Sequence, residues 1–427
     1  MKPIDLTTIA PIIRGLCINT GEYPWVIIYD PAKGEIPPEA LTVDIAAAIT
    51  ENQNFDEDVA AKVFREAHTA WEFEIAPAGV EAAVKTKTVR KEPSCVAVKN
   101  HDVIEALYWI DRDIDSARKR MHERNASLLE EKLPRPYQAN RDAALRMDAV
   151  RRTAVVKNRI ALVTGGPGGL GGEMVRGLAA SGALVYMANP HREEAEALAR
   201  SINDDEKRTA VIPLEVNVTD EASVKAMFQI VAETTGGLDI CIGNTEANKP
   251  GSMLDQRLED FNLITAVNYI SFFLLAKYAG LLLRGQHRTA PNWKTDIIQI
   301  NSKLGLEGEG KNGAESGGKS GSLGLIASVA LELVEYNIKV NAVCPGHFFD
   351  SPLWSDPDTG LFARHFKAGR FPGAKNAAAV RSRYEAEIPM KRGCIAADVM
   401  RGIYYIIEQE YETGQALPIT GGEVMLH

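Results

Sequence analysis

The second part of the chain alternates short apolar runs with segments of helical length. From residue 158 the apolar runs read RIALVTG, ALVYMAN, TAVIPLEVNV, LDICIGN, DIIQINS and IKVNAVCPG. The intervening segments, such as Glu173 to Ser181 and Glu193 to Ile202, have the length and polarity of surface helices. Strands connected by helical crossovers form mostly parallel sheets that are covered on both faces. The pattern therefore predicts a doubly wound α/β fold with a parallel sheet.

The first part of the chain has a weaker pattern, which predicts a smaller N-terminal α/β domain. Pro24 to Asp30 is a short β-rich run, and Val59, Val63 and Ala67 recur at helical spacing after Asp56. From Asp102, apolar residues recur at alternating steps of four and three, which predicts a long helix that packs on a core or on a partner helix. These residues are Val103, Leu107, Ile110, Ile114, Ala117 and Met121.

A polar stretch with two prolines, Leu133 to Asp142, separates the two patterns. We place the domain boundary between Glu131 and Asn158, which gives an accessory domain at 1–150 and a dinucleotide-binding domain at 151–427. The length of 427 residues agrees with two or three domains. The sequence does not reveal what the accessory domain does.

Composition and charge narrow the function classes. The chain is 45% hydrophobic and 25% charged, which is typical of a folded protein, and its net charge of −9 argues against nucleic acid or an anionic membrane as the main partner. Five scattered cysteines and a start without signal-peptide features favour the cytoplasm. The most apolar stretch, Leu263 to Leu283, contains Asn268 and Lys277, so we expect a buried helix and no membrane span. The eight dispersed histidines predict no metal site.

The loop after the first strand of the second domain has the residues that a bound pyrophosphate requires. Thr164 to Gly171 reads TGGPGGLG and lies between a predicted strand and a predicted helix. Gly165, Gly169 and Gly171 allow unusual φ angles and let a phosphate approach the backbone amides at the helix start. This arrangement favours dinucleotide binding over a merely tight turn.

This loop resembles the TGxxxGxG cofactor loop of the short-chain dehydrogenase/reductase family. Two later segments, VNAVCPG and TGQALPITGG, resemble further signatures of that family, and the resemblance covers residues 158 to 427. Within the family, DIIQINSKLG, FFDSPLWSDPDTGLF and PMKRGC are most similar to the sorbitol-6-phosphate 2-dehydrogenase-like branch. The resemblance implies a Rossmann-like fold, an oxidoreductase with NAD or NADP, a sugar-alcohol phosphate substrate and a homo-oligomer.

The resemblance also implies the cofactor-binding residues: Thr164, Gly165, Gly169, Leu170, Gly171, Asn189, Asn217, Val218, Asn244, Lys319, Pro345 and Gly346. Several of these positions depart from the family pattern. Asn189 and Asn217 replace acids, and Glu246 stands where the family has a glycine. Without an acid at Asn189 the choice between NAD and NADP stays open, and His191 and Arg192 either accept a 2′-phosphate or form a solvated helix start.

The catalytic positions match the family only in part. Ser302, Lys319 and Asn268 fit its serine, lysine and asparagine, but the tyrosine position falls on Glu315. The chemistry needs a neutral acid at the developing alkoxide, and an ionised carboxylate about 4 Å away would cost roughly 4 kcal/mol at an effective dielectric of about 20. We therefore expect little turnover by the usual relay. Two alternatives stay open: an ordinary i,i+4 pair of Glu315 with Lys319, and burial that protonates Glu315.

The sequence thus predicts an NAD(P)-binding, polyol-phosphate type oxidoreductase whose catalysis is impaired or altered. The alternatives are a non-catalytic cofactor-binding regulator and a structural assembly subunit. A basic segment in the expected substrate-covering region would either bind a sugar phosphate or form a solvated surface. It contains Arg364, His365, Lys367, Arg370 and Lys375.

Overall fold

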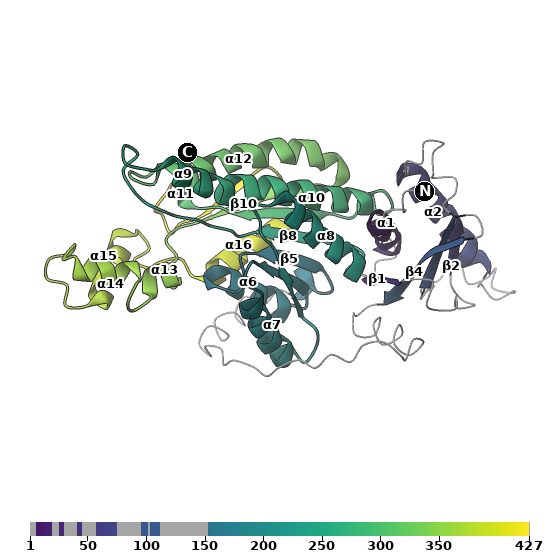
Figure 1. The fold of residues 1–427 in the computed structure, drawn as a ribbon, viewed down its shortest axis with the longest axis horizontal. Helices are drawn as coiled ribbons and strands as arrows, with labels where there is room; N and C mark the ends of the chain where they lie inside the picture. The colour runs from purple at the N-terminus through teal and green to yellow at the C-terminus, as the bar shows by residue number, and fades with distance from the viewer. Residues whose placement is uncertain are drawn as a thin grey trace. The chain divides into compact units, whose positions relative to one another are not determined.

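The structure is a computed structural model that describes residues 6–18, 25–29, 41–44, 57–74, 95–100, 103–111 and 153–426. The chain forms two compact units (Figure 1). The first comprises Met1–Pro134 together with Phe228–Leu238 and Gly280–Trp293. The second comprises Arg135–Met227, Asp239–Ala279 and Lys294–His427.

The second unit contains the predicted parallel sheet. Its seven strands have the order β11-β10-β9-β8-β5-β6-β7, and each adjacent pair is parallel. The strands are β5 (Ile160–Thr164), β6 (Leu184–Asn189), β7 (Val211–Glu215), β8 (Ile240–Gly243), β9 (Thr295–Ile300), β10 (Ile338–Pro345) and β11 (Ala416–Ile419). The predicted doubly wound fold and its one parallel sheet are therefore confirmed.

Helices cover the sheet of this unit on both faces. In Figure 1, α6 (Gly169–Ala180) and α7 (Arg192–Glu206) lie on one side of the sheet, and α10 (Ser271–His287) and α12 (Gly313–Leu333) lie on the other. The remaining helices are α5 (Thr153–Val156), α8 (Glu221–Thr235), α9 (Leu258–Thr265), α11 (Lys303–Leu306), α13 (Pro352–Ser355), α14 (Leu361–Lys367), α15 (Ala377–Glu387) and α16 (Ala396–Glu408). A short π-helix, Ala266–Ile270, called the π-turn below, joins α9 to α10. A short 3₁₀ helix, Val334–Tyr336, follows α12.

The strands are buried on both faces, which explains their continuous apolar runs. Every residue of β5, β8, β9 and β10 is buried. Side chains of α6, α7 and α16 complete one core cluster with Val163, Val185 and Ile298. This packing fixes the carboxyl ends of the strands, where ligands bind in folds of this kind.

A helical lobe, α13 to α15, follows β10 and has its own aromatic core. Phe349 lies 5.0 Å from Trp354 and 5.3 Å from Phe362 between ring centroids, and Tyr384 packs against the same cluster. These tilted and edge-to-face contacts stabilise the lobe beyond simple burial. Figure 1 shows the lobe projecting from the rest of the second unit.

The first unit contains α1 (Leu6–Ile18), α2 (Glu57–Glu74) and a four-stranded sheet with the order β1-β4-β3-β2. Its strands are β1 (Trp25–Tyr29), β2 (Leu41–Asp44), β3 (Cys95–Asn100) and β4 (Val103–Asp111). The predicted strand after Pro24 and the predicted helix after Asp56 are thus confirmed.

The predicted long helix from Asp102 is wrong over its first part, because Val103–Asp111 forms strand β4. That segment, VIEALYWID, is rich in β-branched and aromatic residues, and both of its edges pair, antiparallel, with β1 and β3. Most positions of a central strand are apolar. Apolar residues three and four positions apart, such as Val103, Leu107 and Ile110, therefore occur in it without a helix. The rest of the predicted stripe, Ile114, Ala117 and Met121, lies outside the described residues.

Helix α1 packs within the first unit against the ends of α8 and α10. The Arg14 side chain is fully buried and donates a hydrogen bond of 3.3 Å to the Leu238 carbonyl. Gln286 donates to the same carbonyl at 2.8 Å, and Thr289 Oγ1 donates to the Ile12 carbonyl at 2.6 Å. This unit therefore includes segments from both sides of the predicted boundary, and the domain limits of 1–150 and 151–427 stay a prediction.

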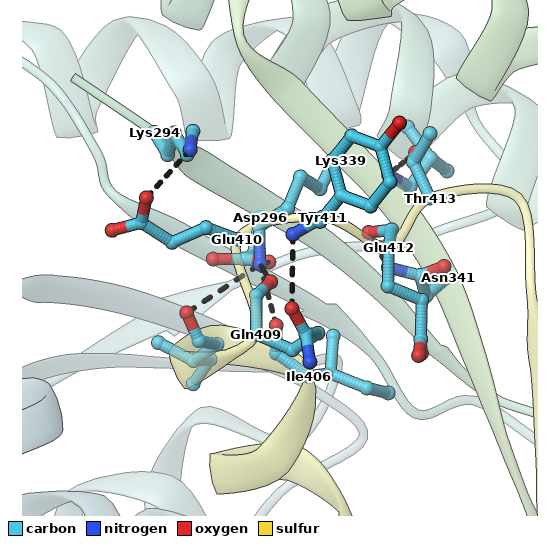
Figure 2. A network of polar contacts seen from close by, with 12 residues as sticks. Lys294, Asp296, Lys339, Asn341, Ile406, Gln409, Glu410, Tyr411, Glu412 and Thr413 are labelled. Carbon is cyan, nitrogen blue, oxygen red and sulfur yellow. Dashed lines mark hydrogen bonds and ion pairs between the residues drawn. The ribbon is translucent and has the colours of Figure 1, made fainter. Parts of the chain in front are cut away.

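A buried polar network holds the amino ends of β9 and β10 against the end of α16 (Figure 2). Lys339 Nζ lies 2.9 Å from Asp296 Oδ1, with both side chains buried. The same ammonium donates to the carbonyls of Ile406, Ile407 and Gln409 at the carboxyl end of α16. Those carbonyls have no partner inside the helix, so Lys339 acts as its cap.

One described helical stretch, Leu258–His287, is long and apolar enough to cross a membrane by composition alone. Half of its apolar window is buried inside the structure, which is also common for a core helix. The expectation that it is a core helix stays a prediction.

Candidate active site

The glycine loop between β5 and α6 forms a close-packed turn. Gly165 has φ of +74°, and a Cβ added there would lie 1.7 Å from the Asn244 carbonyl oxygen. A Cβ on Gly171 would lie 2.4 Å from the Gly165 carbonyl oxygen. Only glycine fits either position, so the loop can close tightly over the end of β5.

The start of α6 is open toward a ligand. Gly169, the first helical residue, has φ of +52°, and the nearest atoms to an added Cβ are 3.9 Å away. No side chain caps the first turn of α6. Uncapped amides at the start of a helix are the arrangement that binds phosphate oxygens. Leu170, in the same turn, is half-buried against the core cluster.

The two asparagines at expected cofactor positions hold local turns. Asn189, at the end of β6, donates its amide to the Gly166 carbonyl and accepts from the His191 amide at 2.7 Å. Asn217 accepts hydrogen bonds from the backbone and hydroxyl groups of Thr219 at 3.1 and 2.8 Å. Asn189 thus ties the glycine loop to β6, and Asn217 shapes the turn that leads into α8.

A pocket lies at the carboxyl ends of the central strands and brings Thr164 and Val218 together. Thr164 Oγ1 also accepts a hydrogen bond of 3.1 Å from the Asn244 amide, which joins the loops after β5 and β8. The pocket is lined by Thr164, Val218, Val224, Gly243, Thr245, Ser271, Phe272, Leu275 and Gln299.

Asn268 lies in the π-turn and fixes the loop after β8. Its side-chain amide donates to the Ala247 carbonyl at 2.7 Å, and its side-chain oxygen accepts from the Ala247 amide at 3.3 Å. Gly318 of α12 packs against it, since an added Cβ there would lie 3.2 Å from Asn268 Cβ. Asn268 thereby connects α12 to the segment that carries Glu246.

Ser302 and Lys319 are joined through Asn301. The Ser302 amide donates to Asn301 Oδ1 at 2.8 Å, and Asn301 Nδ2 donates to the Lys319 carbonyl at 3.0 Å. Lys319 is only 2% exposed, and its ammonium donates to the Asn301 carbonyl at 3.5 Å. Ser302 Oγ accepts from the Leu304 amide at 3.2 Å, so its own proton is free to donate elsewhere.

Glu315 lies in the first turn of α12 and is only 3% exposed. Burial raises the pKa of Glu315 to about 7, the Glu246 carboxylate adds to the rise, and the Lys319 ammonium opposes it. Glu309 raises this pKa further. Oxygen Oε2 of Glu315 has no hydrogen-bond partner in the structure. The pKa of Glu315 therefore lies well above the usual range of a carboxyl, which agrees with the alternative that burial protonates this residue.

The loop after β10 completes the site. Pro345 ends the strand, and the Gly346 amide donates to the Ile419 carbonyl at 3.0 Å. Glu423 accepts from the His347 amide at 3.0 Å, contacts the His347 ring at 2.5 Å, and lies 3.3 Å from Lys303 Nζ. Burial alone would raise the pKa of Glu423, but these partners hold it below its usual value.

Sequence reasoning missed Asn301, Ala247 and Glu423 as residues that position the site. The sequence offered only neighbourhood as a signal. Asn301 precedes Ser302, Ala247 follows Glu246, and Glu423 ends the TGGE segment. Backbone groups of Ala247 carry no sequence signal, so only the structure reveals that contact.

The basic residues of the helical lobe are mostly exposed. Arg364, Lys367 and Arg370 lie on its surface, and the guanidinium carbon of Arg370 lies 5.8 Å from the Tyr384 ring centroid. His365 Nδ1 lies 2.8 Å from the Tyr384 hydroxyl, and burial together with Arg370 and Arg364 lowers the pKa of His365. Lys375 is exposed as well.

Comparison with known proteins gives a consistent result for the second half of the chain. A sequence profile described as short chain dehydrogenase matches residues 159–357. The chain is 32% identical over 272 residues to sorbitol-6-phosphate 2-dehydrogenase of Escherichia coli strain K12, a match that covers 63% of this chain and 99% of that protein. It is 29% identical over 271 residues to nodulation protein G of Rhizobium sp. strain N33, covering 63% of this chain and 98% of that protein.

A solved structure shows the same relationship in three dimensions. The crystal structure of sorbitol-6-phosphate 2-dehydrogenase from Erwinia amylovora aligns with a TM-score of 0.57 and 32% identity. The alignment covers 62% of this chain and all of that one. The matched relatives thus account for the second part of the chain and leave the first part without a counterpart in them.

Proposed function

The chain belongs to the short-chain dehydrogenase family, and from that premise we propose that it is an NAD(P)-dependent oxidoreductase acting on a sugar-alcohol phosphate. The observation that carries this proposal is that Asn301 joins Ser302 to Lys319 by hydrogen bonds and that Asn268 packs on α12, the helix that carries Lys319. Members of the family typically use NAD(P). The named relatives with 32% identity are sorbitol-6-phosphate 2-dehydrogenases, which supports a phosphorylated polyol as the substrate class.

The residues present fit a dinucleotide. Gly165 and Gly171 leave no room for a Cβ, and the uncapped amides at Gly169 and Leu170 would hold the pyrophosphate. Val218, Asn244, Pro345 and Gly346 would line the rest of the cofactor site. Bound there, the dinucleotide would accept or supply the electrons of the reaction. The side chain at Asn189 neither repels nor requires a 2′-phosphate, so NAD and NADP are both proposed.

The chain's own residues would orient and polarise the substrate. The Ser302 hydroxyl has a free proton to donate to the reacting oxygen, and the buried Lys319 ammonium supplies a positive charge within the site. Asn268 keeps the loop after β8 in place. The exposed cations Arg364, Lys367 and Arg370 support phosphate binding by the helical lobe.

A non-catalytic cofactor-binding regulator is the second candidate, and the carboxyl at the tyrosine position favours it. The two candidates differ in one measurement: both bind NAD or NADP, but only the oxidoreductase reduces the bound dinucleotide when sugar-alcohol phosphates are added. We place the protein in the cytoplasm in either case.

We also propose a homo-oligomer. Large apolar side chains are exposed on α9 and the π-turn, with Leu258 at 69%, Leu263 at 58% and Ile270 at 43% exposure. Exposed large apolar side chains are frequent at association surfaces. Sedimentation analysis of the purified chain would show a monomer if this proposal is wrong.

Replacing Gly169 by valine should weaken NAD or NADP binding at least about 100-fold and also lower the stability of the protein, because valine is strained at a positive φ. The added Cβ meets no atom closer than 3.9 Å, but φ of +52° at this position strains a β-branched residue, and the side chain would stand over the amides that receive the phosphates. Calorimetric titration measures the affinity, and circular dichroism checks the fold.

The matched control is Gly324→Ala, at an exposed position of α12 where an added Cβ meets nothing within 4 Å. This variant should bind the cofactor as the wild type does. Equal affinity in Gly169→Val and wild type would contradict a cofactor site in the glycine loop.

A further inference from the structure

Both departures from the family pattern near the reacting groups lie at one place. The family resemblance puts tyrosine at position 315 and glycine at position 246, and this chain has a glutamate at each. The Glu246 carboxyl lies close enough to Glu315 to raise the pKa of the Glu315 carboxyl, in addition to the rise that burial causes. Two independent losses of function would have no reason to bring two carboxyl groups together.

Hydrogen bonds hold the segments that carry the two carboxyl groups in fixed relative positions. Asn268 binds both backbone groups of Ala247, the residue after Glu246, at 2.7 and 3.3 Å. Ser322 Oγ of α12 donates to the Asn268 carbonyl at 2.9 Å. Loop, π-turn and α12 are thus connected by hydrogen bonds that set Glu246 against Glu315.

The Glu315 carboxyl is buried, and one of its oxygens is available to a ligand or a proton. The Glu315 side chain is only 3% exposed, and its oxygen Oε2 has no hydrogen-bond partner. Lys319, one helical turn further along, forms no ion pair with it, although both residues are described; its ammonium donates to the Asn301 carbonyl instead. An unpartnered buried carboxyl oxygen costs free energy unless a ligand or a proton satisfies it.

We propose that Glu315 replaces the family's tyrosine as the group that exchanges a proton with the substrate oxygen, and that Glu246 is a positioning residue that shares this proton. The inference rests on the proposed oxidoreductase function. In the oxidation direction the substrate O–H bond breaks and its proton passes to the ionised Glu315 carboxylate. The carbon-bound hydrogen would leave with its electron pair to an oxidised dinucleotide held by the glycine loop, and a carbonyl group would form.

The charges around Glu315 make this exchange possible near neutral pH. Burial, Glu246 and Glu309 disfavour its ionised form, while Lys319 favours that form, and the result is a pKa of about 7. The positive end of the α12 dipole also favours the carboxylate. A group with a pKa near the working pH both accepts and donates a proton effectively.

The first test follows the proton directly, without cofactor or substrate. In protein labelled with ¹³C at the glutamate carboxyl carbons, NMR should show one resonance that titrates near pH 7 and disappears in Glu315→Gln. In Glu246→Gln the same resonance should titrate at lower pH, because a neutral amide replaces the repelling carboxylate. Glu307→Gln, in the exposed loop before α12, is the matched control and should leave the titration unchanged.

The second test measures turnover on a panel of sugar alcohols and their phosphates. Glu315→Gln should lower kcat by 10²- to 10⁴-fold, the usual range for a general acid or base, with cofactor affinity retained. Glu246→Gln should move the acidic limb of the pH profile to lower pH. Higher turnover in Glu315→Tyr than in wild type would overturn the inference and leave the proposed oxidoreductase standing.

Other outcomes separate the two proposals. Absence of any glutamate that titrates above pH 6 would overturn the shared proton, whatever the activity. Cofactor binding without turnover in wild type, Glu315→Gln and Glu315→Tyr would overturn the oxidoreductase itself, and with it the catalytic role of Glu315.

Discussion

Replacing Lys339 by methionine is expected to lower the free energy of unfolding by about 3–5 kcal/mol, as for other buried ion pairs that lose one partner. The variant leaves Asp296 buried without its cation and deprives three carbonyls at the end of α16 of their donor. Denaturant unfolding followed by circular dichroism measures the loss. Asp296→Asn combined with Lys339→Met should lose less, because no buried charge remains.

The loss of stability in Lys339→Met should depend on pH. Burial raises the pKa of Asp296 to about 6, while Lys339 and Arg159 oppose the rise and Asp239 adds to it. The folded protein therefore binds this proton more tightly than the unfolded chain does, and the stability that the proton contributes is present below pH 3.8 and is lost as the pH rises through about 6. Without Lys339 the cost of ionising Asp296 grows, so the loss should be larger at pH 8 than at pH 5. A loss below about 1 kcal/mol at pH 8 would mean that water reaches Asp296.

Replacing Lys319 by methionine should reduce turnover by about 10²- to 10⁴-fold, the range of a positioned proton-transfer group. Methionine preserves most of the buried volume but removes the only cation known to favour ionised Glu315 among its described neighbours. Oxidation requires ionised Glu315 as proton acceptor, so the rate should rise with pH through the pKa of this group. In the variant that pKa is higher, and the rise should occur at higher pH.

Steady-state kinetics between pH 5 and pH 10 measure both effects. Lys225→Met, at an exposed position of α8, is the control and should match the wild type. A lower rate in Lys319→Met without a displaced pH profile would assign Lys319 a purely structural role.

Periodicity and residue type were sufficient for the dehydrogenase-like half of the chain. A buried parallel strand is apolar on both faces and a crossover helix on one, so the alternation could be read without knowing any contact. The same reasoning failed at Val103–Asp111, because a central strand and a helix can both show apolar residues at steps of three and four. Pairing with β1 and β3 decided the strand, and pairing depends on residues distant in sequence.

For the site, the sequence by itself determined which residues are present: the glycines of the cofactor loop, Ser302, Lys319, Asn268, and the carboxyl at Glu315 in place of a tyrosine. It could not determine the state of that carboxyl, since a pKa depends on burial and on charges brought near by folding. The tertiary structure decided that Glu315 is buried, that Glu246 from another loop faces it, and that Lys319 turns its ammonium to Asn301. Local sequence fixes chemistry at each position, whereas the low dielectric and the neighbours that tune it exist only once distant segments pack together.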